Sequence, residues 1–104
     1  MVFVTIELTG EDRLLTVRME GEIDHNSVEM IRNSVEKEIR RTGALNIAFD
    51  FSGVSFMDSS GVGLIMGRFK TVSSLGGKII IYGMNNYIER IMRMSGIEKI
   101  AEIY

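Results

Sequence analysis

Residues 78–82 read KIIIY, and this run of three isoleucines follows the pair Gly76-Gly77. A short, uninterrupted stretch of β-branched apolar residues is typical of a strand that helices cover on both faces, as in a parallel sheet. Upstream, residues 45–51 (LNIAFDF) predict another strand, residues 52–58 a loop, and residues 59–75 a helix that ends at the glycine pair. A strand, a helix and a strand in this order predict an α/β fold with a right-handed parallel crossover.

The N-terminal part of the chain predicts an antiparallel hairpin followed by a helix. Apolar side chains alternate with polar ones along residues 2–8 and 14–19, on either side of the turn-forming letters TGED at residues 9–12. The helix is expected to begin with Asn26 as its N-cap and Glu29 as the acid of a capping box.

The C-terminal part predicts one more helix and one more strand. That helix is expected to be capped by Asn85 or Asn86, and a short strand is expected in residues 100–104. Glycines mark the ends of the two outer helices, at Gly43 and Gly96. The order β-β-α-β-α-β-α-β predicts a mixed sheet of four to five strands with an antiparallel N-terminal hairpin, parallel crossovers after it, and about three helices, all in one domain spanning residues 1–104.

Composition excludes several classes of function. The 104 residues include no cysteine and one histidine, so a thiolate zinc site, a cysteine nucleophile and a histidine-rich metal site are ruled out, and we expect no metal and no cofactor. The net charge is −2 and the sequence has no basic run, which argues against nucleic acid as a partner. The first residues do not resemble a signal peptide, and no apolar run approaches the roughly 20 residues of a membrane span. We therefore expect a cytoplasmic protein with no membrane contact.

Residues 56–70, FMDSSGVGLIMGRFK, are the stretch that is hardest to explain by a purely structural role. They place Gly61, Gly63 and Gly67 inside a predicted helix. Each interior glycine costs about 1 kcal/mol relative to alanine, so we expect a compensating role. At 100° per residue, one side of the helix carries the apolar residues expected to face the sheet: Val62, Ile65, Met66, Phe69 and Val72. The opposite side carries Ser60, Gly63, Gly67, Lys70 and Ser74.

This small-residue side predicts a flat strip that a partner helix or backbone could approach closely, with Leu64 beside it as an apolar anchor. A loop of the same chain lying over the strip is the alternative. Gly61 lies nearer the sheet, where close packing within the protein could account for it.

Asp58, Ser59 and Ser60 stand at the predicted start of the same helix. Aspartate and serine are preferred N-caps, so capping alone explains one of them. The remaining hydroxyl is open to phosphorylation, because the free N–H groups and the dipole of a helix N-terminus favour an added anion. Such a charge would oppose a tight interface, which makes this junction a candidate binding switch.

At these residues the sequence resembles the STAS-domain anti-anti-sigma factors of Gram-positive bacteria, most closely the sporulation type. The resemblance covers nearly the whole chain. It is carried by residues 21–25 (GEIDH), residues 56–70, Gly76-Gly77, and residues 90–96 (RIMRMSG).

The resemblance implies a regulatory protein that switches between partners. Its unphosphorylated form would bind an anti-sigma factor serine kinase with a histidine-kinase-like ATPase fold and so release the sigma factor. The kinase would then phosphorylate Ser59 but not Ser60, and a PP2C-type phosphatase would restore the binding form. Asp24 matches a family position beside the phosphorylation site. The other residues expected to contact the partner are Met57, Asp58, Ser60, Gly61, Gly63, Leu64, Gly67 and Arg68, with Met94 as a further candidate.

Enzymatic readings have less support. Ser59, His25 and Asp24 supply the residue types of a hydrolase triad, but neither serine lies in a Gly-x-Ser-x-Gly motif. No P-loop or complete dinucleotide fingerprint is present, and a phospho-aspartate receiver built on Asp50 would need an acidic pair that the first strand lacks. We therefore predict that the chain is not an enzyme. The remaining alternative is a STAS-type regulatory module that binds a nucleotide or lipid, or a stress-signalling scaffold.

Overall fold

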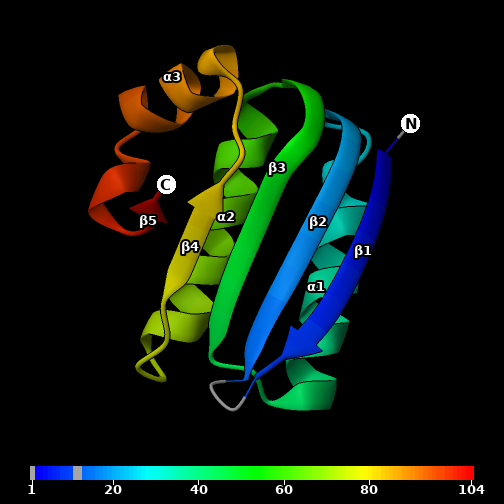
Figure 1. Ribbon diagram of the computed structural model, residues 1–104, viewed down its shortest axis with the longest axis vertical. Helices are drawn as coiled ribbons and strands as arrows, with labels where there is room; N and C mark the ends of the chain where they lie inside the picture. Colours follow the sequence, from blue (N-terminus) through cyan, green and yellow to red (C-terminus); the bar gives the residue numbers. More distant parts are fainter. Residues whose placement is uncertain (1, 11–12) are drawn as a thin grey trace.

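The computed structural model describes residues 2–10 and 13–104, so the predicted turn at residues 9–12 lies partly outside the described residues. Figure 1 shows a sheet with helices packed behind and beside it. In chain order the elements are β1 (Val2–Thr9), β2 (Leu14–Ile23), α1 (Val28–Thr42), β3 (Asn46–Met57), α2 (Ser59–Ser73), β4 (Ile79–Tyr82), α3 (Asn86–Met94), the 3-10 helix η1 (Ile97–Lys99) and β5 (Glu102–Ile103).

The sheet has five strands in the order β1-β2-β3-β4-β5. Strands β1 and β2 pair antiparallel, and each later neighbour pairs parallel. The predicted order of elements and the mixed sheet are therefore confirmed.

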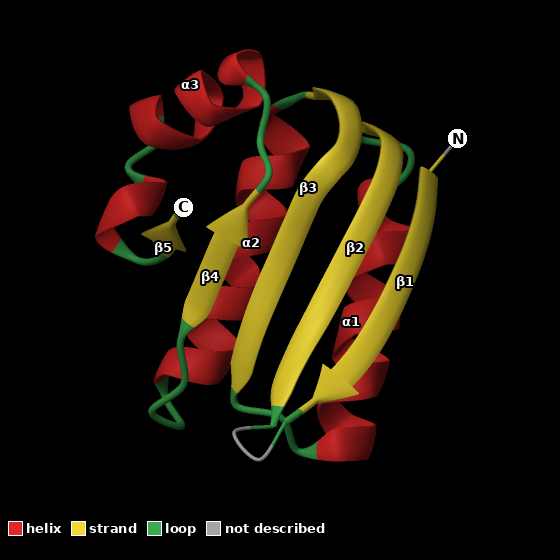
Figure 2. Ribbon diagram, viewed as in Figure 1, coloured by secondary structure: helices red, strands yellow, loops and turns green. Residues whose placement is uncertain are grey.

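Helices α1 and α2 both lie on one face of the sheet, and the other face carries no helix among the described residues (Figure 2). The prediction that helices cover both faces of the KIIIY strand is therefore wrong. Ile79 and Ile81 are fully buried under the helices, whereas Ile80 and Tyr82 are only half-buried on the open face. Ile80 lies between its pairing partners Ala48 on β3 and Glu102 on β5, with no helix of the described residues over it.

Strand β3 is longer than the sequence predicts. Residues 52–57, expected in a loop, continue the pairing with β2 up to Met57 opposite Ile23. The register shifts twice along this stretch, which is the mark of β-bulges. Gly53 lies at the irregular part, where a Cβ would come within 3.0 Å of the Met19 carbonyl oxygen. The strand thus delivers Met57 to the core, directly before the start of α2.

The first helix begins later than predicted, at Val28, with Ser27 as its N-cap residue. Asn26 is not the cap. The Asp24 Oδ1 atom instead accepts hydrogen bonds from the backbone N–H groups of Asn26 and Ser27, at 3.0 and 2.9 Å. The predicted capping box is also absent, because the Asn26 N–H is bound by Asp24 and Glu29 faces Arg32 instead. Two other predicted signals are confirmed: Gly43 ends α1 in the left-handed conformation, and the Asn85 side chain caps α3 through the Ile88 N–H.

The turns that follow β2, β3 and β4 all lie at one edge of the sheet, because these strands run parallel. We call it the carboxyl edge; it is the upper edge in Figure 1. It brings together residues 24–27, the start of α2 and the start of α3. No helix in the described parts of the chain is both long enough and apolar enough to span a bilayer.

Candidate partner-binding site

The start of α2 is fixed by the carboxylate of Asp58. Asp58 Oδ1 accepts a hydrogen bond from the backbone N–H of Ser60 at 2.8 Å, and the Asp58 N–H donates to the Ile23 carbonyl oxygen at 3.1 Å. The bond from the Ser60 N–H is the main reason why the pKa of Asp58 lies below its ordinary value. Asp58 is therefore an ionised N-cap that anchors the helix to the end of β2.

The second oxygen of Asp58 connects this helix to the turn after β2. Asp58 Oδ2 accepts from the backbone N–H of His25 at 3.3 Å. Within that turn, Asp24 is half-buried and its carboxylate is occupied by the local backbone bonds described above. The two segments that the sequence singles out, around Asp24 and around Ser59, are thus neighbours at the carboxyl edge.

Ser59 is the first residue of α2 and its side chain is exposed. Among the described residues, no hydrogen bond involves its hydroxyl group. Ser60, the neighbouring serine, is half-buried. Of the two hydroxyl-bearing residues at this junction, Ser59 is the one presented to solvent.

The outward side of α2 is open at Gly63 and Gly67. A Cβ atom built at either position meets nothing within 4 Å. The predicted small-residue strip therefore exists, and no described loop of the chain lies over these two positions. We call the residues of this side, Ser59, Gly63, Met66, Gly67 and Lys70, the glycine face; Gly67 is half-buried and the other four are exposed.

Three residues predicted as partner contacts are instead buried. Leu64 is 3% exposed, Met57 is fully buried, and Arg68 is 6% exposed. Leu64 and Arg68 lie one turn apart on the side of α2 that meets α1, so the predicted anchor Leu64 belongs to the core. The apolar residue that does accompany the open glycines is Met66, which we expected to face the sheet and which is 39% exposed. Met94 is 81% exposed and stays a candidate.

Gly61 also belongs to the interior. A Cβ at this position would overlap the Met57 side chain, which is itself fully buried and has little room to move. Close packing within the protein thus accounts for Gly61, as the sequence suggested, and leaves Gly63 and Gly67 without such a reason.

Arg68 joins the two long helices. Its Nε atom lies 2.8 Å from Glu36 Oε1 on α1, while its Nη1 atom is buried without a hydrogen-bond partner in the described residues. Burial lowers the pKa of Arg68 from its ordinary value, and the Glu36 charge opposes that shift. The guanidinium is a contact between helices rather than a group reaching toward Ser59.

The geometry gives no support to the catalytic alternatives. His25 and Asp24 are engaged through their turn, and no hydrogen bond of the described residues joins either one to Ser59. Asp50 lies on the open face of the sheet, where it accepts from the Ser52 N–H at 2.9 Å and faces Arg18 at 3.5 Å. Residues 2–10 and 13–104 contain no group of three or more His, Asp or Glu side chains able to hold a metal ion.

Comparison with known proteins agrees with this architecture. Residues 5–104 match the family model described as STAS domain. The chain is 36% identical to an anti-sigma F factor antagonist of Paenibacillus polymyxa over 99 residues, which are 95% of this chain and 85% of that protein. It is 28% identical to an anti-sigma-B factor antagonist of Staphylococcus aureus over 100 residues, which are 96% of this chain and 92% of that protein.

Two solved structures share the fold. The anti-sigma factor antagonist SpoIIAA in its unphosphorylated form superposes with a TM-score of 0.85 at 28% identity, covering 98% of this chain and 88% of that chain. The Bacillus cell fate determinant SpoIIAA in the phosphorylated form gives a TM-score of 0.77 at 28% identity, over 98% and 91% of the two chains. With the family model spanning nearly its full length, the chain belongs to the STAS-domain family.

Proposed function

We propose that this chain is an anti-sigma factor antagonist of the sporulation type. Its unphosphorylated form binds an anti-sigma factor that is also a serine kinase with a histidine-kinase-like ATPase fold, and the sigma factor is released. Phosphorylation of Ser59 ends this binding, and a PP2C-type phosphatase reverses it, in the cytoplasm. The names of its relatives support this role, because they are antagonists of anti-sigma factors and not enzymes.

The observation that carries the proposal is the exposed Ser59 hydroxyl next to an open glycine face. A kinase can reach this hydroxyl without unfolding the helix, and a partner backbone can approach α2 closely at Gly63 and Gly67. One surface therefore serves both as the docking site and as the site of modification.

The physical basis of the switch is the cost of removing a phosphate from water. A phosphoserine carries about −1.5 to −2 charges at neutral pH. The free N–H groups at the start of α2 tolerate this charge in the unbound protein, so the domain stays folded. In a closely packed complex the same charge loses its water and lies beside the Asp58 carboxylate. Binding is weakened while folding is not.

The test is to identify the residue that receives phosphate. After incubation of the chain with its cognate anti-sigma factor kinase and ATP, mass spectrometry of the peptides should place a single phosphate on Ser59. Ser60→Ala is the matched control and should be phosphorylated as wild type, whereas Ser59→Ala should not be. Phosphate on Ser60, or on neither serine, would overturn the proposal.

The small-ligand alternative has no comparable observation in its favour. A surface depression of about 320 Å³ is lined by Leu14, Asn46, Lys78 and Ile80. These residues lie at the amino ends of the parallel strands, which is the edge of the sheet opposite to Ser59. A ligand in this depression would not contact the glycine face.

A further inference from the structure

The carboxyl edge carries an exposed aromatic pair that the proposed function does not use. The rings of Phe56 and Tyr87 stack with their centroids 6.2 Å apart and an angle of 23° between their planes. Phe56 is 39% exposed and Tyr87 is 53% exposed. Much of the surface of both rings therefore remains in contact with water.

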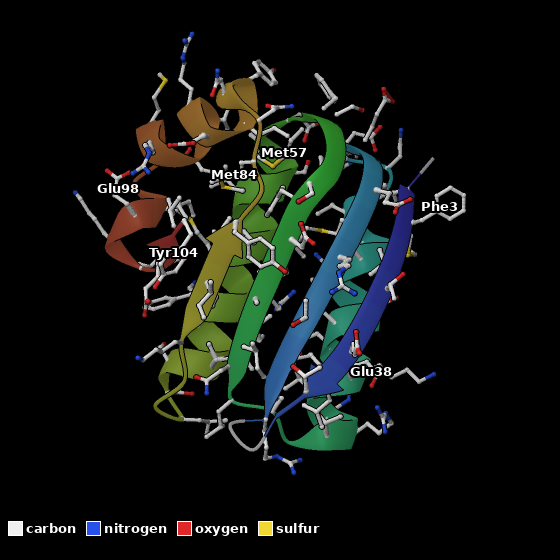
Figure 3. The ribbon with its side chains drawn as sticks, in the orientation of Figure 1. Phe3, Glu38, Met57, Met84, Glu98 and Tyr104 are labelled. Atoms are coloured by element: carbon white, nitrogen blue, oxygen red, sulfur yellow. The ribbon has the colours of Figure 1, made fainter. Side chains whose placement is uncertain are left out.

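The pair lies close to Ser59. Phe56 is at the end of β3, three residues before Ser59, and Tyr87 is in the first turn of α3. Met57, which follows Phe56, and Met84, which precedes Tyr87 by three positions, lie together at this edge of the sheet in Figure 3. Because Tyr87 contacts Phe56, and Phe56 precedes Ser59 by three residues, the aromatic pair lies at the carboxyl edge near the start of α2.

The glycine face alone is too small to hold a protein partner. From Ser59 to Lys70 the helix rises about 16 Å, and a helix is about 10 Å wide, so the face covers on the order of 150 Å². A specific complex buries about 800 Å² on each partner. A partner seated on Ser59 therefore covers neighbouring elements as well.

The two flanks of the start of α2 differ in chemistry. On the side of α1, residues 24–27 read DHNS and offer polar groups that are largely used within their own turn. On the side of α3, the Phe56–Tyr87 pair offers two ring surfaces. Tyrosine and phenylalanine are enriched in the buried centre of protein interfaces, and tyrosine is among the residues that most often dominate their energetics.

We infer that the stacked pair of Phe56 and Tyr87 is an apolar anchor for the same anti-sigma factor kinase that docks on the glycine face. This inference rests on the proposed function and extends its docking surface from α2 onto the start of α3. The two stacked rings present adjacent apolar surfaces that a partner can cover together. An aromatic anchor at this place would also explain why a phosphate on Ser59 weakens binding, since the new charge would lie at the rim of an apolar contact.

The experiment measures the affinity of the unphosphorylated chain for the purified kinase, with ADP in place of ATP so that no phosphoryl transfer occurs. Tyr87→Ala should weaken binding at least 10-fold, and Tyr87→Phe should bind within about 2-fold of wild type because it keeps the ring. Circular dichroism should show both variants folded, since Tyr87 is more than half exposed.

Tyr104→Ala is the matched control. Tyr104 is 77% exposed and directly follows β5, the strand at the end of the sheet beside β4 (Figure 3). This variant should bind as wild type.

The outcomes separate the two proposals. If wild type binds and Tyr87→Ala binds equally well, the aromatic anchor is wrong while the proposed function stands. If Tyr104→Ala loses as much affinity as Tyr87→Ala, the effect is not local and the anchor is again wrong. If wild type shows no binding to the kinase, the proposed function fails and the anchor fails with it.

Discussion

Asp58 is the single residue on which the local structure around Ser59 depends most. One carboxylate oxygen caps α2 and the other holds the turn that contains Asp24. The pKa of Asp58 lies below its ordinary value, chiefly because the Ser60 N–H stabilises the ionised form. The position of the exposed hydroxyl is therefore tied to an ionised cap.

This cap predicts a pH dependence. Because the folded-state pKa of Asp58 lies below the unfolded value of about 3.9, the folded protein binds fewer protons and gains stability from this group above that pH. The gain should disappear as the pH falls through the folded-state pKa. Urea unfolding of wild type and Asp58→Asn should show a stability difference at pH 7 that shrinks below about pH 4.

Asp58→Ala is the companion variant, and it should lose about 1 kcal/mol at pH 7 because the cap is removed entirely. A difference between wild type and Asp58→Asn that is unchanged from pH 7 to pH 3 would contradict the role of the ionised carboxylate.

Two glycines of α2, Gly61 and Gly63, lie two positions apart on nearly opposite sides of the helix, and substitutions at them should change stability in opposite directions. Gly61→Ala should destabilise the domain by about 1–2 kcal/mol, because its methyl group would overlap the buried Met57 side chain. Gly63→Ala should stabilise it by about 0.5–1 kcal/mol, because nothing lies within 4 Å and alanine favours the helix. Thermal unfolding of the two variants checks both signs, and a shift of both melting temperatures in the same direction would be inconsistent with the geometry.

At the level of elements, α2 is a helix that buries two of its sides. One side packs on the sheet through Val62, Ile65 and Val72, and the other packs on α1 through Leu64 and Arg68. The helix is consequently rotated from the orientation that its apolar periodicity predicts, with Met66 outside and Leu64 inside. A helical wheel finds one apolar side, but it does not show where a neighbouring helix will cover a second one.

The contact between α1 and α2 predicts a graded response at Arg68. Arg68→Ala removes both the packed stem and the ion pair with Glu36, and should cost about 2–4 kcal/mol in unfolding free energy. Arg68→Met keeps much of the stem and removes the unpartnered Nη1 atom, so its loss should be clearly smaller. Equal losses in urea unfolding would mean that the stem contributes little.

The open side of α2 predicts a variant that separates folding from binding. Gly63→Leu adds a side chain into open space, so it should leave the fold intact and block the approach of the partner. Ser73→Leu is the control, because position 73 is also exposed but lies at the other end of α2. Gel filtration and a binding titration with the kinase check the pair, and normal binding of Gly63→Leu would exclude the glycine face as the interface.

At the level of the whole molecule, the order of elements could be predicted from sequence because each signal is local. The alternation of apolar and polar residues predicts β1 and β2. N-cap residues and C-terminal glycines predict the helix boundaries to within a few residues. The exposure of Ser59 and the absence of neighbours around Gly63 could also be predicted from sequence, because they depend only on where α2 begins and on which side of it each residue lies.

The features that could not be predicted from sequence are those that depend on packing between segments far apart in the chain. The continuation of β3 to Met57 requires bulged pairing with β2, and an apolar strand such as KIIIY does not reveal whether one face or both will be covered. The stacked rings of Phe56 and Tyr87, 31 positions apart in the sequence, left no periodic signal at all.

Binding of the kinase to two forms of the same chain tests the central claim most directly. The chain is phosphorylated to completion, its mass is verified, and its dissociation constant for the ADP-bound kinase is measured beside that of the unmodified chain. A phosphate penalty of about 3 kcal/mol at the interface predicts a loss of affinity of roughly 100-fold. Equal dissociation constants for the two forms would contradict the account, because the hydroxyl at the start of α2 would then control nothing.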